Sequence, residues 1–272
     1  MQYSHKRLHG IPYPGRKAMA VLLSAICLLG DTSVQAGEWW VGGNLGGGRN
    51  PLVGEDGYAV LVPVVAYCGE RFYANLGNPG PEFFRGMGDF AGLGYHLLDD
   101  EQFTLDLVGK FGGLAVDPDD NDELDGLDER KPGFNMGLSA RWDTGLGELN
   151  GQVLTDVSGR SKGQELVASY AYPLSFGAWQ LRPELGVSWV SQDSVDYYVG
   201  VDEDEVRPGR AAYEGDAAAI PFASIQADYA LTERTHLIGG IGVGRLGDGI
   251  ADSPIIEERN LVGGYVGAVY RF

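Results

Sequence analysis

The sequence has few cysteines and no long hydrophobic run. Only 2 cysteines occur among 272 residues, Cys27 and Cys68, and Cys27 lies in an N-terminal segment that we expect to be removed. One remaining thiol cannot form an intramolecular disulfide, so disulfides do not hold this fold together. The longest apolar run covers only residues 18–29, whereas a membrane-spanning helix needs roughly 18 to 20 apolar residues. We therefore expect no membrane helix in the mature chain.

The N-terminus has the pattern of a secretory signal peptide. Basic residues at positions 6, 7, 16 and 17 precede the apolar run, and small side chains follow it at Val34 and Ala36. We expect residues 1–36 to be cleaved off after Ala36 and residues 37–272 to form one domain. Without residues 1–36 the chain loses four basic residues and one acid, which leaves a formal net charge of −21.

Positive charge is therefore scarce, and nucleic acid is excluded as a partner because it binds basic surfaces. Glycine, in contrast, is abundant, with 43 residues. Each glycine costs a helix about 1 kcal/mol relative to alanine, so this composition disfavours a helical fold. The mature chain is expected to be an all-β protein.

Alternation of apolar and polar residues dominates the mature chain and is clearest in Trp179–Val190. Trp179, Leu185 and Trp189 lie on an apolar face, and Arg182 and Glu184 lie on the opposite, mostly polar face. The two tryptophans are ten residues apart, which corresponds to roughly 25 Å along the axis of a tilted strand. That separation matches the distance between the two aromatic girdles of a membrane β-barrel.

Twelve such stretches follow one another, and an even number suits a closed single-chain bacterial barrel. They cover residues 38–47, 57–67, 70–78, 87–97, 102–113, 133–142, 147–158, 163–173, 178–191, 219–231, 235–247 and 260–272. Links after even-numbered stretches are short, whereas links after odd-numbered ones are generally longer, above all residues 114–132 and 192–218. Short turns on one rim and long loops on the other predict a closed antiparallel transmembrane β-barrel of 12 strands in the cell outer membrane.

The last stretch supports this location. Val262, Val266, Tyr270 and the terminal Phe272 share one face. We interpret Tyr270 and Phe272 as the signal read by the barrel-assembly machinery. Outer-membrane lipid and lipopolysaccharide would then surround the barrel.

Charged residues of both signs fall at positions expected to face the barrel interior. They are Asp106, Lys110, Arg141, Asp156, Glu165, Arg182, Glu184, Asp228 and Arg271. A selective pore more often carries a ring of one sign, so a mixed set predicts pairing across a filled or narrowed lumen. We expect Arg182 and Asp228, on neighbouring strands, to lie within reach of each other.

Catalytic chemistry has little support. The mature chain contains two histidines, His96 and His236, both expected at the short-turn rim, and no residues are predicted to be catalytic. The acidic stretch 117–129 is a poor match to a calcium loop, because Asp122 replaces the glycine of the sharp turn and Asp128 replaces the closing glutamate. We interpret it as a solvated, mobile external loop, and we expect no enzyme activity, metal or cofactor.

Six segments in one order resemble the MltA-interacting protein family, also called MipA/OmpV. These segments are residues 63–75, 92–98, 124–131, 156–172, 183–191 and 196–213. The resemblance covers nearly the whole mature chain and implies an outer-membrane barrel without catalytic residues. The acidic cluster 202–205 is a local departure from the family's pattern.

The resemblance also implies a role. Members of the family are described as scaffolds that link a lytic murein transglycosylase to a murein synthase in peptidoglycan remodelling, and some as surface porins or adhesins. Our hypothesis is therefore a non-enzymatic scaffold. The alternative is a passive channel or surface adhesin that acts through long acidic external loops.

Overall fold

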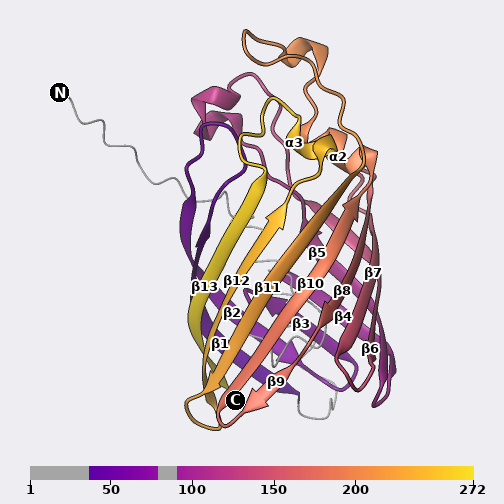
Figure 1. Ribbon diagram of the computed structural model, residues 1–272, viewed down its shortest axis with the longest axis vertical. Coiled ribbons are helices and arrows are strands. Elements are labelled where there is room, and N and C mark those ends of the chain that lie inside the picture. The colour runs from indigo at the N-terminus through magenta and orange to yellow at the C-terminus, as the bar shows by residue number, and fades with distance from the viewer. Residues whose placement is uncertain (1–36, 79–90) are drawn as a thin grey trace, which may run out of the picture.

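A single antiparallel sheet forms the protein, and it closes on itself because β1 pairs with β13. The structure, a computed structural model, describes residues 37–78 and 91–272. The predicted signal peptide, with Ala36, and the predicted start of the fourth strand at residue 87 lie outside the described residues. The closed sheet is a tilted-strand barrel (Figure 1).

The described residues contain thirteen strands and several short helices. The strands are β1 (Glu38–Gly48), β2 (Tyr58–Cys68), β3 (Phe72–Leu76), β4 (Ala91–Asp99), β5 (Phe103–Gly112), β6 (Gly133–Asp143), β7 (Glu148–Asp156), β8 (Gln164–Ala171), β9 (Leu174–Phe176), β10 (Trp179–Val190), β11 (Ala218–Ala230), β12 (Thr235–Arg245) and β13 (Asn260–Arg271). The helices are η1 (Pro118–Asp120), η2 (Asp122–Leu124), α2 (Gln192–Val199), η3 (Glu203–Glu205) and α3 (Asp248–Ala251).

These strands occupy twelve positions in the wall, because β8 and β9 both pair with the same edge of β10 and follow each other along it. Pro173 lies between β8 and β9 and has no N–H to give to the ladder, so the pairing is interrupted there. Pairing resumes at Leu174, opposite Leu181. The predicted 12-stranded closed barrel is confirmed, and its eighth strand extends three residues beyond the predicted end at residue 173.

Burial along the strands is the reverse of that in a soluble protein. In β10, the apolar Leu185 is 65% exposed on the outer face, whereas Arg182 is only 7% exposed on the inner face. Apolar side chains are also exposed along the outer face of β13, from Val262 to Tyr270. An apolar outside and a polar inside suit a barrel surrounded by lipid and exclude a sandwich with an apolar core.

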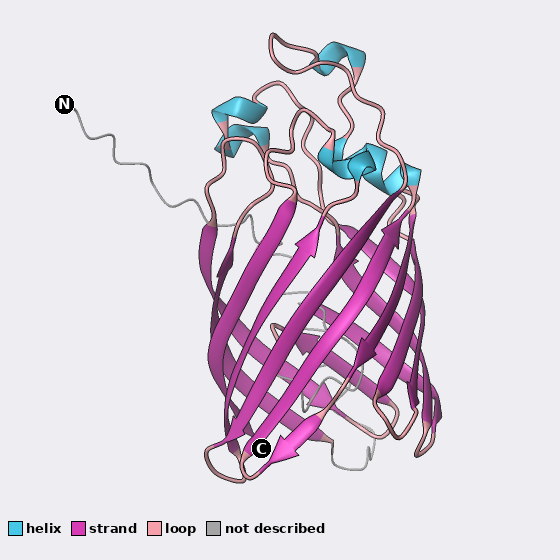
Figure 2. Cartoon of the chain, in the orientation of Figure 1, coloured by secondary structure: helices cyan, strands magenta, loops and turns pink. Residues whose placement is uncertain are grey.

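The two rims differ as the sequence predicted. At one rim, the short-turn end, connections consist of residues 69–71, 100–102, 144–147, 177–178 and 231–234. At the other, the long-loop end, they include residues 113–132, 191–217 and 246–259, and these loops carry every helix of the described part of the chain (Figure 2). No helix within the described residues is both long and apolar enough to cross a membrane.

β3 ends early because the chain turns into the barrel. Gly77 adopts a positive φ of 74°, and a Cβ there would lie 2.6 Å from the carbonyl oxygen of Pro63. The next residue, Asn78, leaves the wall and accepts a hydrogen bond of 2.7 Å from the inward-facing Asn44 side chain. β3 therefore pairs with only the short-turn half of β2.

Candidate functional site: a capped lumen

The predicted interior charges meet in pairs inside the barrel. Lys110 on β5 forms a 3.3 Å ion pair with Glu165 on β8, although two strands separate β5 from β8 in the wall. Arg182 on β10 reaches Glu184 at 2.7 Å and Glu148 of β7 at 3.3 Å. The Lys110–Glu165 and Arg182–Glu148 pairs reach over intervening strands instead of following the wall, so bridging side chains narrow the lumen.

Glu148 is a partner that the sequence reasoning missed. Its position on β7 has the same parity as Asn150 and Gln152, which also line the interior. This parity was a usable signal, because Asp156 has it too and was predicted to face the interior. Glu184, the interior acid of β10, also accepts a hydrogen bond from the Ser169 hydroxyl.

Arg182 and Asp228 do lie on adjacent strands, but they do not pair. In the register of β10 and β11, Arg182 lies opposite Gln226, and Asp228 lies opposite Gln180. Asp228 instead contacts Nδ1 of His236 at 2.8 Å. The two charges are therefore diagonal neighbours on adjacent strands, as expected, although each pairs with another group.

Both histidines lie at the short-turn end and each contacts a carboxylate. His96 Nδ1 is 2.8 Å from Asp106, which also accepts a 2.8 Å hydrogen bond from the Tyr73 hydroxyl. The second pair is more deeply buried, with Asp228 only 1% exposed and His236 4% exposed. These contacts fix both rings inside the wall, on opposite sides of the barrel.

The remaining interior charges are held locally. Arg141 donates a 2.8 Å hydrogen bond to Thr104 Oγ1 on the neighbouring strand. Arg271 lies over the Trp40 ring, 5.6 Å from its centroid. Asp156, at the end of β7, accepts hydrogen bonds from the backbone N–H groups of Ser161 and Lys162. Asp156 therefore shapes the loop 157–163 rather than the lumen.

The loops at the long-loop end pack into a cap with its own apolar core. Four connections contribute buried side chains to one cluster, so the loops meet over the barrel mouth. The cluster contains Leu52, Val116, Leu124, Leu127, Val195, Val199, Val201, Ala218, Leu246, Ile250, Ala251 and Ile255. We call these loops the cap, and Figure 1 shows them gathered above the strands.

The cap corrects the interpretation of residues 117–129. We expected a solvated, mobile loop, but Leu124 is 1% exposed and Leu127 is 7% exposed within the cap core. Asn121 also donates a 2.9 Å hydrogen bond to the carbonyl oxygen of Val53 in another loop. The exposed acidic residues of this stretch include Asp122, Glu123, Asp125, Asp128 and Glu129, and their charge led us to expect solvent around Leu124 and Leu127 as well.

Glu205 is the polar centre of the cap. Both carboxylate oxygens accept hydrogen bonds from Nη2 of Arg130, at 2.8 and 2.9 Å, and further bonds come from the backbone N–H groups of Asp128 and Asp202. Burial raises the pKa of the Glu205 carboxyl, but these donors outweigh it and hold the pKa below the ordinary value of 4.5. Arg210 continues the network by donating to the carbonyl oxygens of Asp125 and Glu205.

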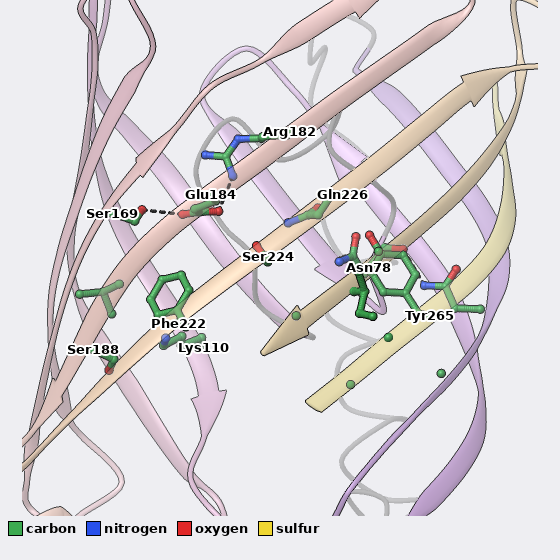
Figure 3. A pocket seen from close by; sticks show the side chains of 18 of the residues that line it. Asn78, Lys110, Ser169, Arg182, Glu184, Ser188, Phe222, Ser224, Gln226 and Tyr265 are labelled. Carbon is green, nitrogen blue, oxygen red and sulfur yellow. Dashed lines mark hydrogen bonds and ion pairs between the residues drawn. The ribbon is translucent and has the colours of Figure 1, made fainter. Parts of the chain in front are cut away.

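Beneath the cap lie two contiguous cavities. The upper one, the apolar chamber, has a volume of about 950 Å³ and is lined by side chains such as Leu114, Val199, Ile220 and Leu246. The lower one, the polar chamber, has a volume of about 600 Å³. Its lining includes Lys110, Ser169, Arg182, Glu184, Ser224, Gln226 and Tyr265 (Figure 3).

The comparisons with known proteins agree with this geometry. The model of a family described as MltA-interacting protein MipA matches residues 41–272. The putative outer membrane protein YiaT of Escherichia coli is 27% identical over 88% of this chain and 93% of its own length. Outer membrane protein OmpV of Vibrio cholerae is 28% identical over 87% of this chain and 88% of its own.

A third relative is the MltA-interacting protein of Escherichia coli, which is 27% identical over 82% of this chain and 85% of its own length. Two of the segments that carry the family resemblance meet in the cap. Segment 124–131 contains Arg130 and segment 196–213 contains Glu205, and these two residues are hydrogen-bonded to each other. The family match and the barrel confirm the predicted location and resemblance. This chain is an outer-membrane protein and belongs to the MltA-interacting protein MipA family.

Proposed function

We propose that the protein is a non-enzymatic interaction protein that holds a lytic murein transglycosylase, together with a murein synthase, at the periplasmic end of the barrel. The observation that favours this proposal over a passive channel is the cap, whose apolar core joins four loops over the external mouth. Loops packed over the mouth in this way obstruct the entrance and disfavour a passive channel. The ion pair between Lys110 and Glu165 across the lumen points in the same direction.

The chemistry of the interior also favours a role without catalysis. A hydrolytic site needs a nucleophile beside its base. Within the described residues, His96 and His236 instead contact Asp106 and Asp228 inside the periplasmic half of the wall. The name of the relative from Escherichia coli, MltA-interacting protein, supports a murein transglycosylase as the partner class.

The periplasmic rim would have to act as one surface. A stable interface buries roughly 800 Å² on each partner, and every connection at this rim is short. Leu146 lies in the turn 144–147 and is 76% exposed. We take it as an apolar anchor for the partner, because interface energy concentrates in a few buried side chains.

A retention assay tests the proposal. The folded, detergent-solubilised barrel is immobilised, and a purified lytic transglycosylase is passed over it and over an unrelated outer-membrane barrel. We expect selective retention, and we expect Leu146→Asp to reduce it at least fivefold. Val206→Asp is the matched control, because Val206 is an exposed apolar residue of the cap. Retention no higher than on the unrelated barrel would overturn the proposal.

A surface adhesin is the second candidate, and the packing of the cap favours it. A loop surface held by a core of its own presents a fixed shape to a partner, whereas a mobile loop must first be ordered. Binding of the purified barrel to host cells or matrix proteins distinguishes the two functions. The scaffold proposal expects no loss of transglycosylase retention when exposed cap residues are changed.

A further inference from the structure

The apolar and polar chambers adjoin and differ in chemistry. Glu165, Phe222 and Ser224 line both chambers, so the two spaces meet at these residues. Ligand sites in proteins are typically cavities of roughly 300 to 1,000 Å³ with mostly apolar walls and a few placed polar groups. Each chamber has a volume within this range, and together they show this division of chemistry.

The apolar end lies under the cap. Its lining comes from cap side chains such as Val195 and Ile250 and from inward-facing strand residues such as Val60 and Ile220. Water in such a space is poorly hydrogen-bonded, and an apolar ligand displaces it at little cost. This end therefore suits the apolar body of a ligand.

The polar end contains charges that already have partners. Lys110 pairs with Glu165, and Arg182 pairs with Glu184, so both signs are present and compensated. A charged head group would face a like charge and compete with an existing ion pair. An uncharged polar head avoids both costs.

Two buried acceptors of residues that line the polar chamber have no donor within residues 37–78 and 91–272. Gln226 is 9% exposed and Asn44 is 3% exposed, and in this part of the chain no group donates to Gln226 Oε1 or Asn44 Oδ1. Donation by Asn44 to Asn78 fixes which end of its amide is the oxygen. A buried acceptor without a donor is unfavourable, so a ligand hydroxyl group toward which either amide turned would relieve that cost.

We infer that the two chambers bind one amphiphile, with its apolar body beneath the cap and an uncharged, hydroxyl-rich head beside Gln226 and Asn44. This ligand site is separate from the periplasmic docking surface. Its occupant is retained by shape at one end and by hydrogen bonding at the other.

Equilibrium dialysis of the full barrel in lipid nanodiscs tests the inference. Radiolabelled octyl glucoside is used far below its micellar concentration, with protein-free nanodiscs as the baseline. We expect saturable binding of about one molecule of octyl glucoside per barrel beyond the amount that protein-free nanodiscs take up. Octyl sulfate and octyltrimethylammonium should bind at least tenfold more weakly, because each carries a charge into the paired chamber.

Two matched substitutions on β11 locate the site. Ile220→Trp fills the apolar chamber and should weaken the excess binding at least tenfold. Ile225→Trp places the same bulk on the lipid face, where Ile225 is 40% exposed, and should leave binding unchanged. Heat-modifiable migration on a denaturing gel confirms that each variant is folded.

A second pair tests the head group without adding bulk. Gln226→Leu should weaken octyl glucoside binding severalfold, whereas Gln180→Leu, which does not line the chamber, should have no effect. The inference is overturned if nanodiscs that contain the wild-type barrel bind no more octyl glucoside than protein-free nanodiscs do. It is also overturned if the Ile220→Trp barrel binds octyl glucoside as strongly as the wild-type barrel. Equal binding of the charged and uncharged amphiphiles would overturn it as well.

Discussion

Arg130 and Glu205 are 75 residues apart in sequence and are joined by two hydrogen bonds of 2.8 and 2.9 Å. Arg130 precedes β6 and Glu205 lies in η3, so this contact ties two of the longest external loops together. Glu205 is 5% exposed. A buried ion pair of this kind fixes the relative position of the loops it joins.

Replacing Glu205 should therefore loosen the cap. Removing one partner of a buried pair costs roughly 3–5 kcal/mol, because the other charge is left uncompensated. We expect Glu205→Gln to accelerate tryptic cleavage within the cap at least about tenfold. The control is Glu203→Gln, in the same short helix but exposed, which should be cleaved at the wild-type rate. Equal rates for the two variants would contradict the assigned role.

Acid should loosen the cap through the same residue. The folded-state pKa of Glu205 lies below 4.5, so its carboxylate stabilises the folded cap above about pH 4.5. That contribution is lost as the pH falls through the lower folded-state value. We expect amide hydrogen exchange of residues 201–210 in wild type, corrected for intrinsic rates, to rise below pH 4.5. Glu205→Gln should show no such rise, and a parallel rise in both proteins would refute this assignment.

Tyr198 should stabilise the cap more than its neighbour Tyr197 does. The Tyr198 hydroxyl accepts a 2.9 Å hydrogen bond from Gly133 N–H and donates one of 3.1 Å to the Gly112 carbonyl, across the loop between β5 and β6. The contacts of the Tyr197 hydroxyl with the Lys131 backbone are solvent-exposed and longer, at 3.3 and 3.5 Å. Tyr198→Phe should lower the free energy of unfolding of the cap by about 1–2 kcal/mol, and Tyr197→Phe should lower it much less.

The urea concentration at which chymotrypsin begins to cut the cap measures this difference. If this urea concentration fell more for Tyr197→Phe than for Tyr198→Phe, the Tyr197 hydroxyl would contribute more to the stability of the cap, which would contradict the prediction.

The two histidine pairs should differ in their cost of removal. His236 is the only hydrogen-bond partner of the Asp228 carboxylate within the described residues, whereas Asp106 keeps the Tyr73 hydroxyl when His96 is lost. His236→Phe should therefore destabilise the barrel by roughly 3–5 kcal/mol, and His96→Phe by about 1 kcal/mol. Guanidinium unfolding in lipid vesicles measures both values. Similar losses would mean that Asp228 is compensated by other groups.

Much of the barrel wall was predictable because a strand repeats every two residues. The alternation in Trp179–Val190 fixes which side chains face lipid, and the short links fix which strands are adjacent. The interruption at Pro173 was less predictable, since a proline can end a strand or only interrupt its ladder.

The candidate site was only partly predictable, because it depends on contacts between distant segments. The alternation placed Lys110 and Glu165 inside the barrel, but their contact across two intervening strands depends on tilt and curvature. In the acidic stretch, Leu124 and Leu127 become buried only against loops from other parts of the chain. Local composition therefore indicated solvent where tertiary packing made a core.

Planar-bilayer conductance of the purified, folded protein tests the closed external mouth most directly. The apolar cluster that joins four loops over the lumen, and the ion pair between Lys110 and Glu165, predict a barrel that inserts without stepwise currents. Heat-modifiable migration establishes that the inserted protein is folded. Steady, reproducible channels from the intact chain would contradict a capped barrel and would favour a passive channel instead.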